Sequence, residues 1–93
     1  MHDWTFSSLS VDWKTGDASL VFLNPESQPA PVVIRGISLL NLPRKREWGM
    51  SVSVNSVSGP VALADGNVRI EIEMQSGDLI EIIADSILLP SGG

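Results

Sequence analysis

Three cations stand next to one another at positions 44 to 46, in the stretch PRKREWG, and Trp48 follows two residues later. The whole chain has 6 lysine and arginine residues against 11 aspartate and glutamate residues, so half of its cations lie here. Arginine and tryptophan are enriched at interaction hot spots, and a guanidinium group can stack on an indole. In an extended segment, Arg44, Arg46 and Trp48 share one side. We predict that these three residues bind an acidic protein partner or a small anion. The alternatives are a solvated loop and an inward-facing Trp48.

Three glutamates form a second candidate site. Glu71, Glu73 and Glu81 fall on the outer face of the last two predicted strands. Paired carboxylates can act as acid and base or hold a hard cation, and His2 is the only imidazole that could join them. The same pattern is typical of a solvated face that discourages aggregation, and we expect Glu71 and Glu81 to face each other well solvated. A cation-binding protein or a small enzyme is therefore the alternative function.

Composition excludes several other kinds of site. The chain has no cysteine, which removes disulfides, thiol catalysis and Cys-ligated zinc or iron–sulfur centres. No serine lies in a Gly-x-Ser-x-Gly elbow, and the glycine motifs that bind phosphate are absent. The preferred interpretation therefore has no catalytic residue, no cofactor and no metal ion.

Charge and hydropathy restrict the partners and the location. The net charge is −5, and a chain of this sign is repelled by phosphate, so we expect no nucleic-acid partner. No window approaches the roughly 20 apolar residues of a membrane helix, and the start lacks the basic and apolar regions of a signal peptide. Together with the missing disulfides, these features predict an acidic cytoplasmic protein that does not bind membranes.

The chain reads as a series of strands. Apolar residues alternate with polar ones, and no segment keeps a helical period for three turns. This pattern predicts an all-β fold, a single small antiparallel sandwich or barrel-like meander over residues 1–90 with a disordered tail at 91–93. The six predicted strands lie at about 3–14, 17–24, 31–42, 50–58, 67–75 and 78–88.

The alternation also fixes the register of the last hairpin. The segments 68–74 and 80–84 both carry apolar side chains at even positions. A loop of three residues ending at Gly77 sets these positions opposite each other, Ile72 with Ile80, whereas a two-residue loop would bring a carboxylate onto the core face. Glycine third in such a loop suits the left-handed position of a type I turn with a bulge.

The first hairpin is predicted by the same reasoning. An even-length loop around KTGD pairs Trp13 with Ala18 on the core face and sets Lys14 against Asp17. The apolar residues change from even to odd positions near 7–8, which predicts a β-bulge there.

Two further features concern the third strand. Its phase changes near Gly36, where a residue without a Cβ allows a sharp bend, and such bends let a small sheet curl. The segment 24–31, with three prolines, is predicted to be a loop because proline cannot pair within a central strand.

Three stretches carry a resemblance to a known group: HDW at 2–4, the PR…WG pattern over 43–49, and IEMQSGD at 72–78. With them, the chain resembles a family of short bacterial proteins of unknown function. The resemblance implies a bacterial, stand-alone cytosolic β-domain. It implies no substrate, cofactor or mechanism.

The sequence therefore favours a protein–protein interaction or accessory binding domain without catalytic activity. Its partner is expected to be another protein or a second copy joined through an exposed strand edge. A purely structural accessory domain without a dedicated site is a further interpretation.

Overall fold

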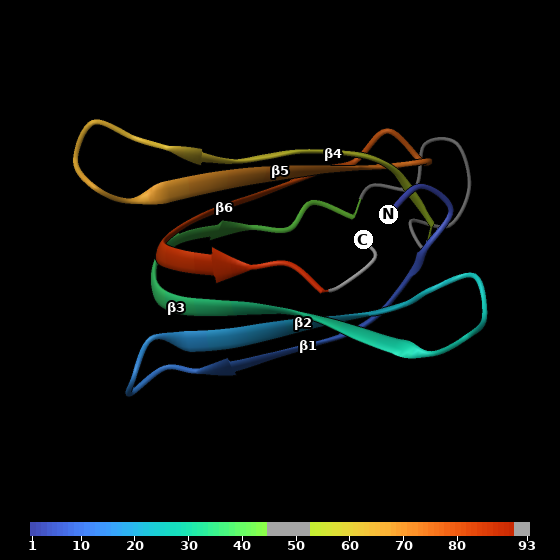
Figure 1. The fold of residues 1–93 in the computed structure, drawn as a ribbon, viewed down its shortest axis with the longest axis horizontal. Coiled ribbons are helices and arrows are strands. Elements are labelled where there is room, and N and C mark those ends of the chain that lie inside the picture. The colour runs from blue at the N-terminus through green and yellow to red at the C-terminus, as the bar shows by residue number, and fades with distance from the viewer. Residues whose placement is uncertain (45–52, 91–93) are drawn as a thin grey trace.

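The computed structural model describes residues 1–44 and 53–90, and it confirms the all-β fold class within them. Six antiparallel strands form one sheet in the order β1-β2-β3-β6-β5-β4 (Figure 1). The strands are β1 Thr5–Asp12, β2 Asp17–Leu23, β3 Pro29–Asn41, β4 Val54–Ala62, β5 Val68–Met74 and β6 Leu79–Leu88. Nothing in the two described ranges forms a helix that could span a membrane.

A bend in β3 folds the sheet back on itself. The first part of β3 pairs with β2, Ile34 opposite Ala18, and its last part pairs with β6, Leu40 opposite Ile82. Gly36 lies between these parts with a φ of 67°, in the region that favours glycine, which confirms the predicted bend. In Figure 1, β3 and β6 both curve round at the same end, so the sheet forms two facing layers.

The two edge strands of the sheet meet only near their beginnings. Thr5 forms an isolated bridge with Ser53. The N–H of Val54 donates to the carbonyl of Trp4 at 2.8 Å, and the N–H of Asp3 donates to the carbonyl of Val54 at 2.9 Å. No other pairing joins β1 to β4 within the described ranges, so the folded sheet stays open along the rest of this side.

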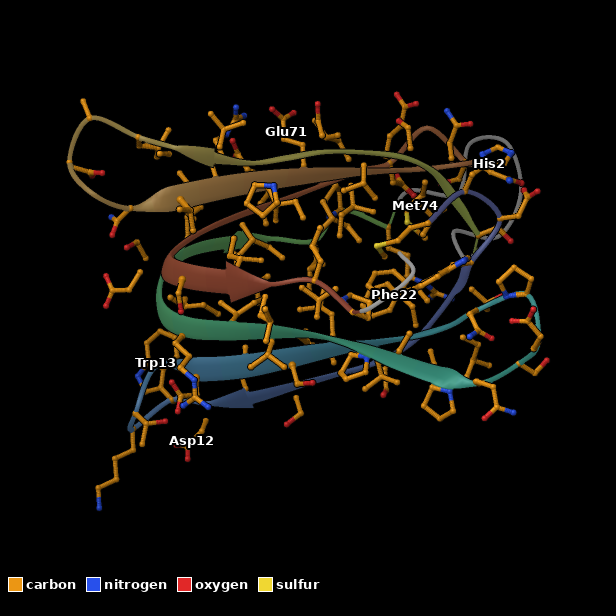
Figure 2. The ribbon with its side chains drawn as sticks, in the orientation of Figure 1. His2, Asp12, Trp13, Phe22, Glu71 and Met74 are labelled. Carbon is orange, nitrogen blue, oxygen red and sulfur yellow. The ribbon has the colours of Figure 1, made fainter. Side chains whose placement is uncertain are left out.

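The core lies between the two layers. Phe22 and Met74 point into it from opposite layers (Figure 2), and the Phe6 ring stacks on Phe22 with centroids 5.0 Å apart. Ile70 and Ile72 are fully buried, as the alternation predicted. The other buried apolar side chains are Trp4, Ala18, Leu20, Ala30, Val32, Ile34, Val54, Ile80, Ile82 and Ala84.

The predicted register of the last hairpin is confirmed. Ile72 lies opposite Ile80, and Ile70 lies opposite Ile82. The N–H of Met74 donates across the loop to the carbonyl of Asp78 at 2.8 Å, and Gly77 has a φ of 94°. This is the left-handed position that the three-residue loop requires.

The first hairpin has an even-length loop, but the predicted pairs are wrong. Val11, not Trp13, lies opposite Ala18, so the register differs from the prediction by two residues. The reason is the Asp12 side chain, whose Oδ1 accepts hydrogen bonds from the N–H groups of Lys14 and Thr15. This local turn holds the four residues after Asp12 out of the strand, and Trp13 is 88% exposed instead of buried.

Two smaller features of this hairpin concern its bulge and its charged pair. The register shifts between Phe6 and Ser8, which confirms the predicted bulge. The predicted pair of Lys14 with Asp17 is wrong, because Asp17 lies opposite Asp12 and its Oδ2 is 3.5 Å from Arg35.

β3 begins earlier than predicted. Pro29, placed in the loop 24–31 by the sequence, pairs with β2, as does Pro31 at the predicted start of the strand 31–42. β6 joins β3 only from Val33 onward, so residues 29–32 have β2 as their one paired neighbour. Proline is tolerated in such an edge segment because its missing N–H can fall on the side that has no neighbouring strand.

β4 runs to Ala62, so the predicted range 50–58 ends too early. The register shifts across Gly59 and Pro60, and pairing with β5 resumes beyond them. An edge strand accommodates proline in a bulge, and the strand therefore continues where the sequence indicated a stop. Residues 50–52 of the predicted strand lie outside the described ranges.

Candidate functional site

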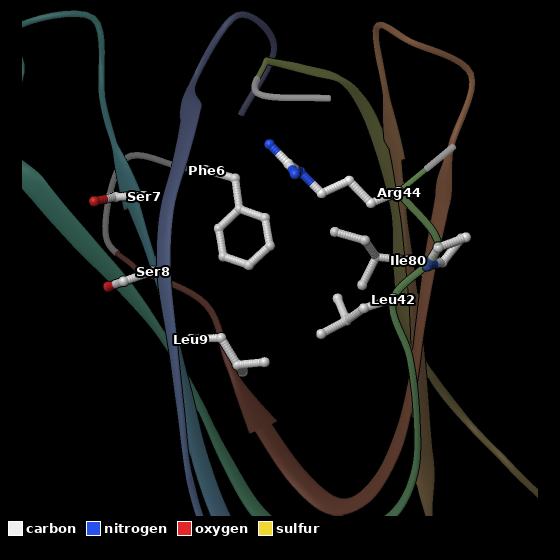
Figure 3. Close-up of a pocket in the computed structure, with 8 residues that line it drawn as sticks. Phe6, Ser7, Ser8, Leu9, Leu42, Arg44 and Ile80 are labelled. Atoms are coloured by element: carbon white, nitrogen blue, oxygen red, sulfur yellow. The ribbon is translucent and has the colours of Figure 1, made fainter. Parts of the chain in front are cut away.

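A groove opens between the layers where β1 faces the residues that follow β3 (Figure 3). Phe6 and Leu9 point into it from β1, and Leu42, Ile80 and Arg44 point into it from the opposite wall. The volume of the groove is about 400 Å³. The described residues that line it are Phe6, Ser7, Ser8, Leu9, Leu42, Pro43, Arg44 and Ile80.

The walls are apolar because these side chains belong to the inner faces of the two layers. Leu9 lies opposite the buried Leu20 in β2, and Ile80 lies opposite the buried Ile72 in β5. Within the described ranges no strand lies beyond β1 at this position, and Leu9 is 37% exposed on the inner face. The groove is therefore part of the core that the folded sheet leaves uncovered.

Among the described residues that line this groove, Arg44 is the one that carries a charge. Its side chain is exposed, and it forms no ion pair with a described residue. Arg35 and Arg69, by contrast, have carboxylate partners. Arg44 thus places an exposed cation at the rim of an apolar groove.

A second groove continues along the same strand. Val11 and Trp13 line it from β1 and the turn after it, and Ile37 and Leu40 line it from β3. Its volume is about 520 Å³. Val11 is 40% exposed although it lies opposite the buried Ala18. The two grooves together follow β1 from Phe6 to Val11.

The structure places one of the three predicted binding residues. Arg44 is brought to the first groove, as described above. Arg46 and Trp48 lie outside the described ranges, and the prediction for them stays a prediction.

The carboxylate patch has a different geometry from the one that we expected. Glu71 and Glu81 are opposite each other, but they are bridged rather than left to solvent. Arg69 Nη1 is 2.6 Å from Glu71 Oε1, Arg69 Nη2 is 2.5 Å from Glu81 Oε2, and Arg69 Nε donates to the same Glu81 oxygen at 2.7 Å. The hydrogen bond to Glu81 is the main cause that raises the pKa of Arg69, with the charge of Glu71 acting in the same direction and desolvation opposing both.

Glu73 and His2 are also engaged with protein groups. Glu73 Oε1 accepts a hydrogen bond from Asn55 Nδ2 at 2.6 Å. His2 Nδ1 donates to the carbonyl of Asn55 at 2.7 Å, and its Nε2 is 3.4 Å from Asp3 Oδ2. Within residues 1–44 and 53–90, no three histidine, aspartate or glutamate side chains converge as metal ligands.

The contribution of β1 to the groove was not predicted from the sequence. Alternation places Leu9, Val11 and Trp13 on the inner face of a strand, but it does not show whether another layer covers that face. One signal was available: from Thr5 to Val11 the segment has no charged residue, which is unusual for an exposed edge.

Comparisons of the chain with family models, with curated proteins and with solved structures find no match.

Proposed function

We propose that this chain is a small protein-binding domain without catalytic activity, and that the groove beside Arg44 receives an apolar side chain of a protein partner. The observation that carries the proposal is the open part of the core between β1 and the residues after β3, with Arg44 at its rim. We place this role in the bacterial cytoplasm, in line with the resemblance and the cysteine-free composition.

Two properties of the site support a protein partner over a small molecule. Beyond Thr5, the grooves follow an edge of β1 that has no paired neighbour within the described ranges, and exposed edges are sites where partner proteins add strands. An arginine next to apolar walls is also typical of interaction hot spots, because a guanidinium group can stack on an aromatic ring or bind a carboxylate.

The test compares two arginine variants. Tagged wild-type protein, Arg44→Ala and Arg35→Ala are used to capture proteins from a lysate, and each captured protein is then purified and titrated. Arg35 is exposed like Arg44 but is paired with Asp17 away from the groove, so it is the matched control. We expect Arg44→Ala to weaken binding about tenfold, roughly the contribution of one charge-assisted hydrogen bond, and Arg35→Ala to leave it unchanged. If Arg44→Ala changes no association of the chain, with itself or with another protein, the proposal is wrong.

A further inference from the structure

We infer that the partner in the groove is a second copy of this chain, joined by antiparallel pairing of the two β1 edges, with Trp13 of each copy in the groove beside Arg44 of the other. This inference rests on the function proposed above and names the partner for the same site. Four features of the structure lead to it.

The first feature is the edge of β1. β1 pairs with β2 on one side, and beyond Thr5 its other side has no paired neighbour within the described ranges. Neither a charged residue nor a proline occurs from Thr5 to Val11. The other edge strand, β4, contains Pro60 and two register shifts, whereas β1 has no proline and a single shift, between Phe6 and Ser8. Prolines and bulges hinder pairing at an edge. β1 is therefore the edge that can accept a further strand.

The second feature is the set of exposed apolar side chains on that strand. Leu9 and Val11 belong to the inner face but are 37% and 40% exposed. Antiparallel pairing that sets Leu9 of each copy opposite Val11 of the other covers all four side chains with apolar contacts. This pairing is related by a twofold axis, so it closes after two copies instead of forming a filament.

The third feature is Trp13, which is 88% exposed. When Leu9 of one copy lies opposite Val11 of the other, Trp13 directly after β1 comes to lie opposite Ser7 of the other copy, at the Phe6–Ser7 end of its β1. The first groove lies at that end, lined by Phe6, Leu42 and Arg44. The indole of Trp13 then leaves water for an apolar groove, as a tryptophan at the centre of an interface does.

The fourth feature is charge. Arg44 is the charged residue among the described residues that line the two grooves, and it forms no ion pair with any of the described residues. A guanidinium group is attracted to the face of an indole, which is the strongest aromatic acceptor of a cation. In the dimer, Trp13 of each copy therefore enters the groove of the other copy and contacts its Arg44, so the contact occurs twice.

Sedimentation equilibrium over a wide range of concentrations tests the inference directly. We expect the wild-type chain to form a dimer and no larger species. Since each copy has a net charge of −5, we also expect added salt to strengthen the dimer by screening the repulsion between the copies.

Two matched pairs of variants locate the interface. Val11→Lys puts an ammonium group on the inner face of β1, whereas Val61→Lys makes the same change on the other edge strand, where Val61 is 58% exposed. Trp13→Ala removes the indole, whereas Lys14→Ala alters the next exposed residue of the same turn. We expect Val11→Lys to abolish the dimer, Trp13→Ala to weaken it at least about tenfold, and both controls to leave it unchanged. Circular dichroism of each variant checks that it is folded.

Two results would overturn the inference. One is a wild-type chain that stays monomeric at every concentration, and the other is a dimer that Trp13→Ala leaves at full strength. A monomer that still captures another protein in an Arg44-dependent manner would refute the dimer while leaving the proposed function intact. A monomer whose associations are all independent of Arg44 would refute both.

Discussion

Glu71 and Glu81 lie directly opposite each other across β5 and β6, and the guanidinium group of Arg69 binds both carboxylates. Like charges opposite each other destabilise a pair of strands. Arg69 therefore decides whether the pair of Glu71 and Glu81 stabilises or destabilises the hairpin.

We predict that Arg69→Met lowers the melting temperature and that a second change, Glu81→Gln, restores part of the loss. The single variant leaves two carboxylates facing each other, whereas the double variant leaves only one. Thermal unfolding of the wild type, both single variants and the double variant gives the coupling between the two positions. Additive effects would show that the bridge is not energetically important.

The pH dependence of this bridge follows from the raised pKa of Arg69. A base with a higher pKa in the folded chain contributes stability that is fully present below its unfolded pKa and is lost only as pH rises through the folded pKa. Arginine stays protonated far above neutral pH even in an unfolded chain, and the shift of the Arg69 pKa is upward. We therefore expect the difference in melting temperature between wild type and Arg69→Met to stay constant from neutral to moderately alkaline pH.

Gly36→Ala is predicted to destabilise the fold by about 1–3 kcal/mol or more. Gly36 has a φ of 67°, and an added Cβ would lie 3.0 Å from the Cβ of Asp85 and would collide with its carboxylate. Gly66→Ala is the control, since Gly66 has a φ of 91° but nothing within 4 Å of the added Cβ. Urea unfolding of both variants separates the cost of the backbone conformation from that of the collision. Equal losses would mean that Asp85 moves aside freely.

Ile70→Ala is predicted to reduce the free energy of unfolding by about 2–5 kcal/mol, because Ile70 is fully buried between the layers. Val61→Ala, at an exposed position of the edge strand β4, is expected to change it by less than about 0.5 kcal/mol. Chemical denaturation measures both. A small loss for Ile70→Ala would indicate that the two layers do not pack as described.

Asp12→Ala is predicted to cost about 1 kcal/mol, the value of the hydrogen bonds that the Asp12 carboxylate accepts in the turn. Asp12→Asn keeps an acceptor at the same place and should retain most of the stability. The variants also test why this hairpin has its register. If Asp12→Ala lets the loop shorten, Trp13 moves into the strand opposite Ala18, and nuclear Overhauser contacts across β1 and β2 will show the new pairs.

The sequence by itself determined the elements that depend on neighbouring residues along the chain. The alternation in 68–74 and 80–84, together with Gly77, predicted the register of the last hairpin correctly at every residue. A shift of one position would have put a carboxylate into the core. Gly36 marked the bend of β3 for a similarly local reason. The all-β class followed from the same period of two.

Only the tertiary structure decided which strands became neighbours and which side chains stayed uncovered. The order that brings β6 between β3 and β5 left β1 as an edge strand. Alternation cannot show this opening, which places Leu9 in one groove with Arg44 and leaves Val11 40% exposed in the second groove. The register of the first hairpin depended on a side-chain hydrogen bond of Asp12 that competes with strand pairing. Alternation specifies which face of a strand is apolar, but the contacts between distant segments specify how much of that face is buried.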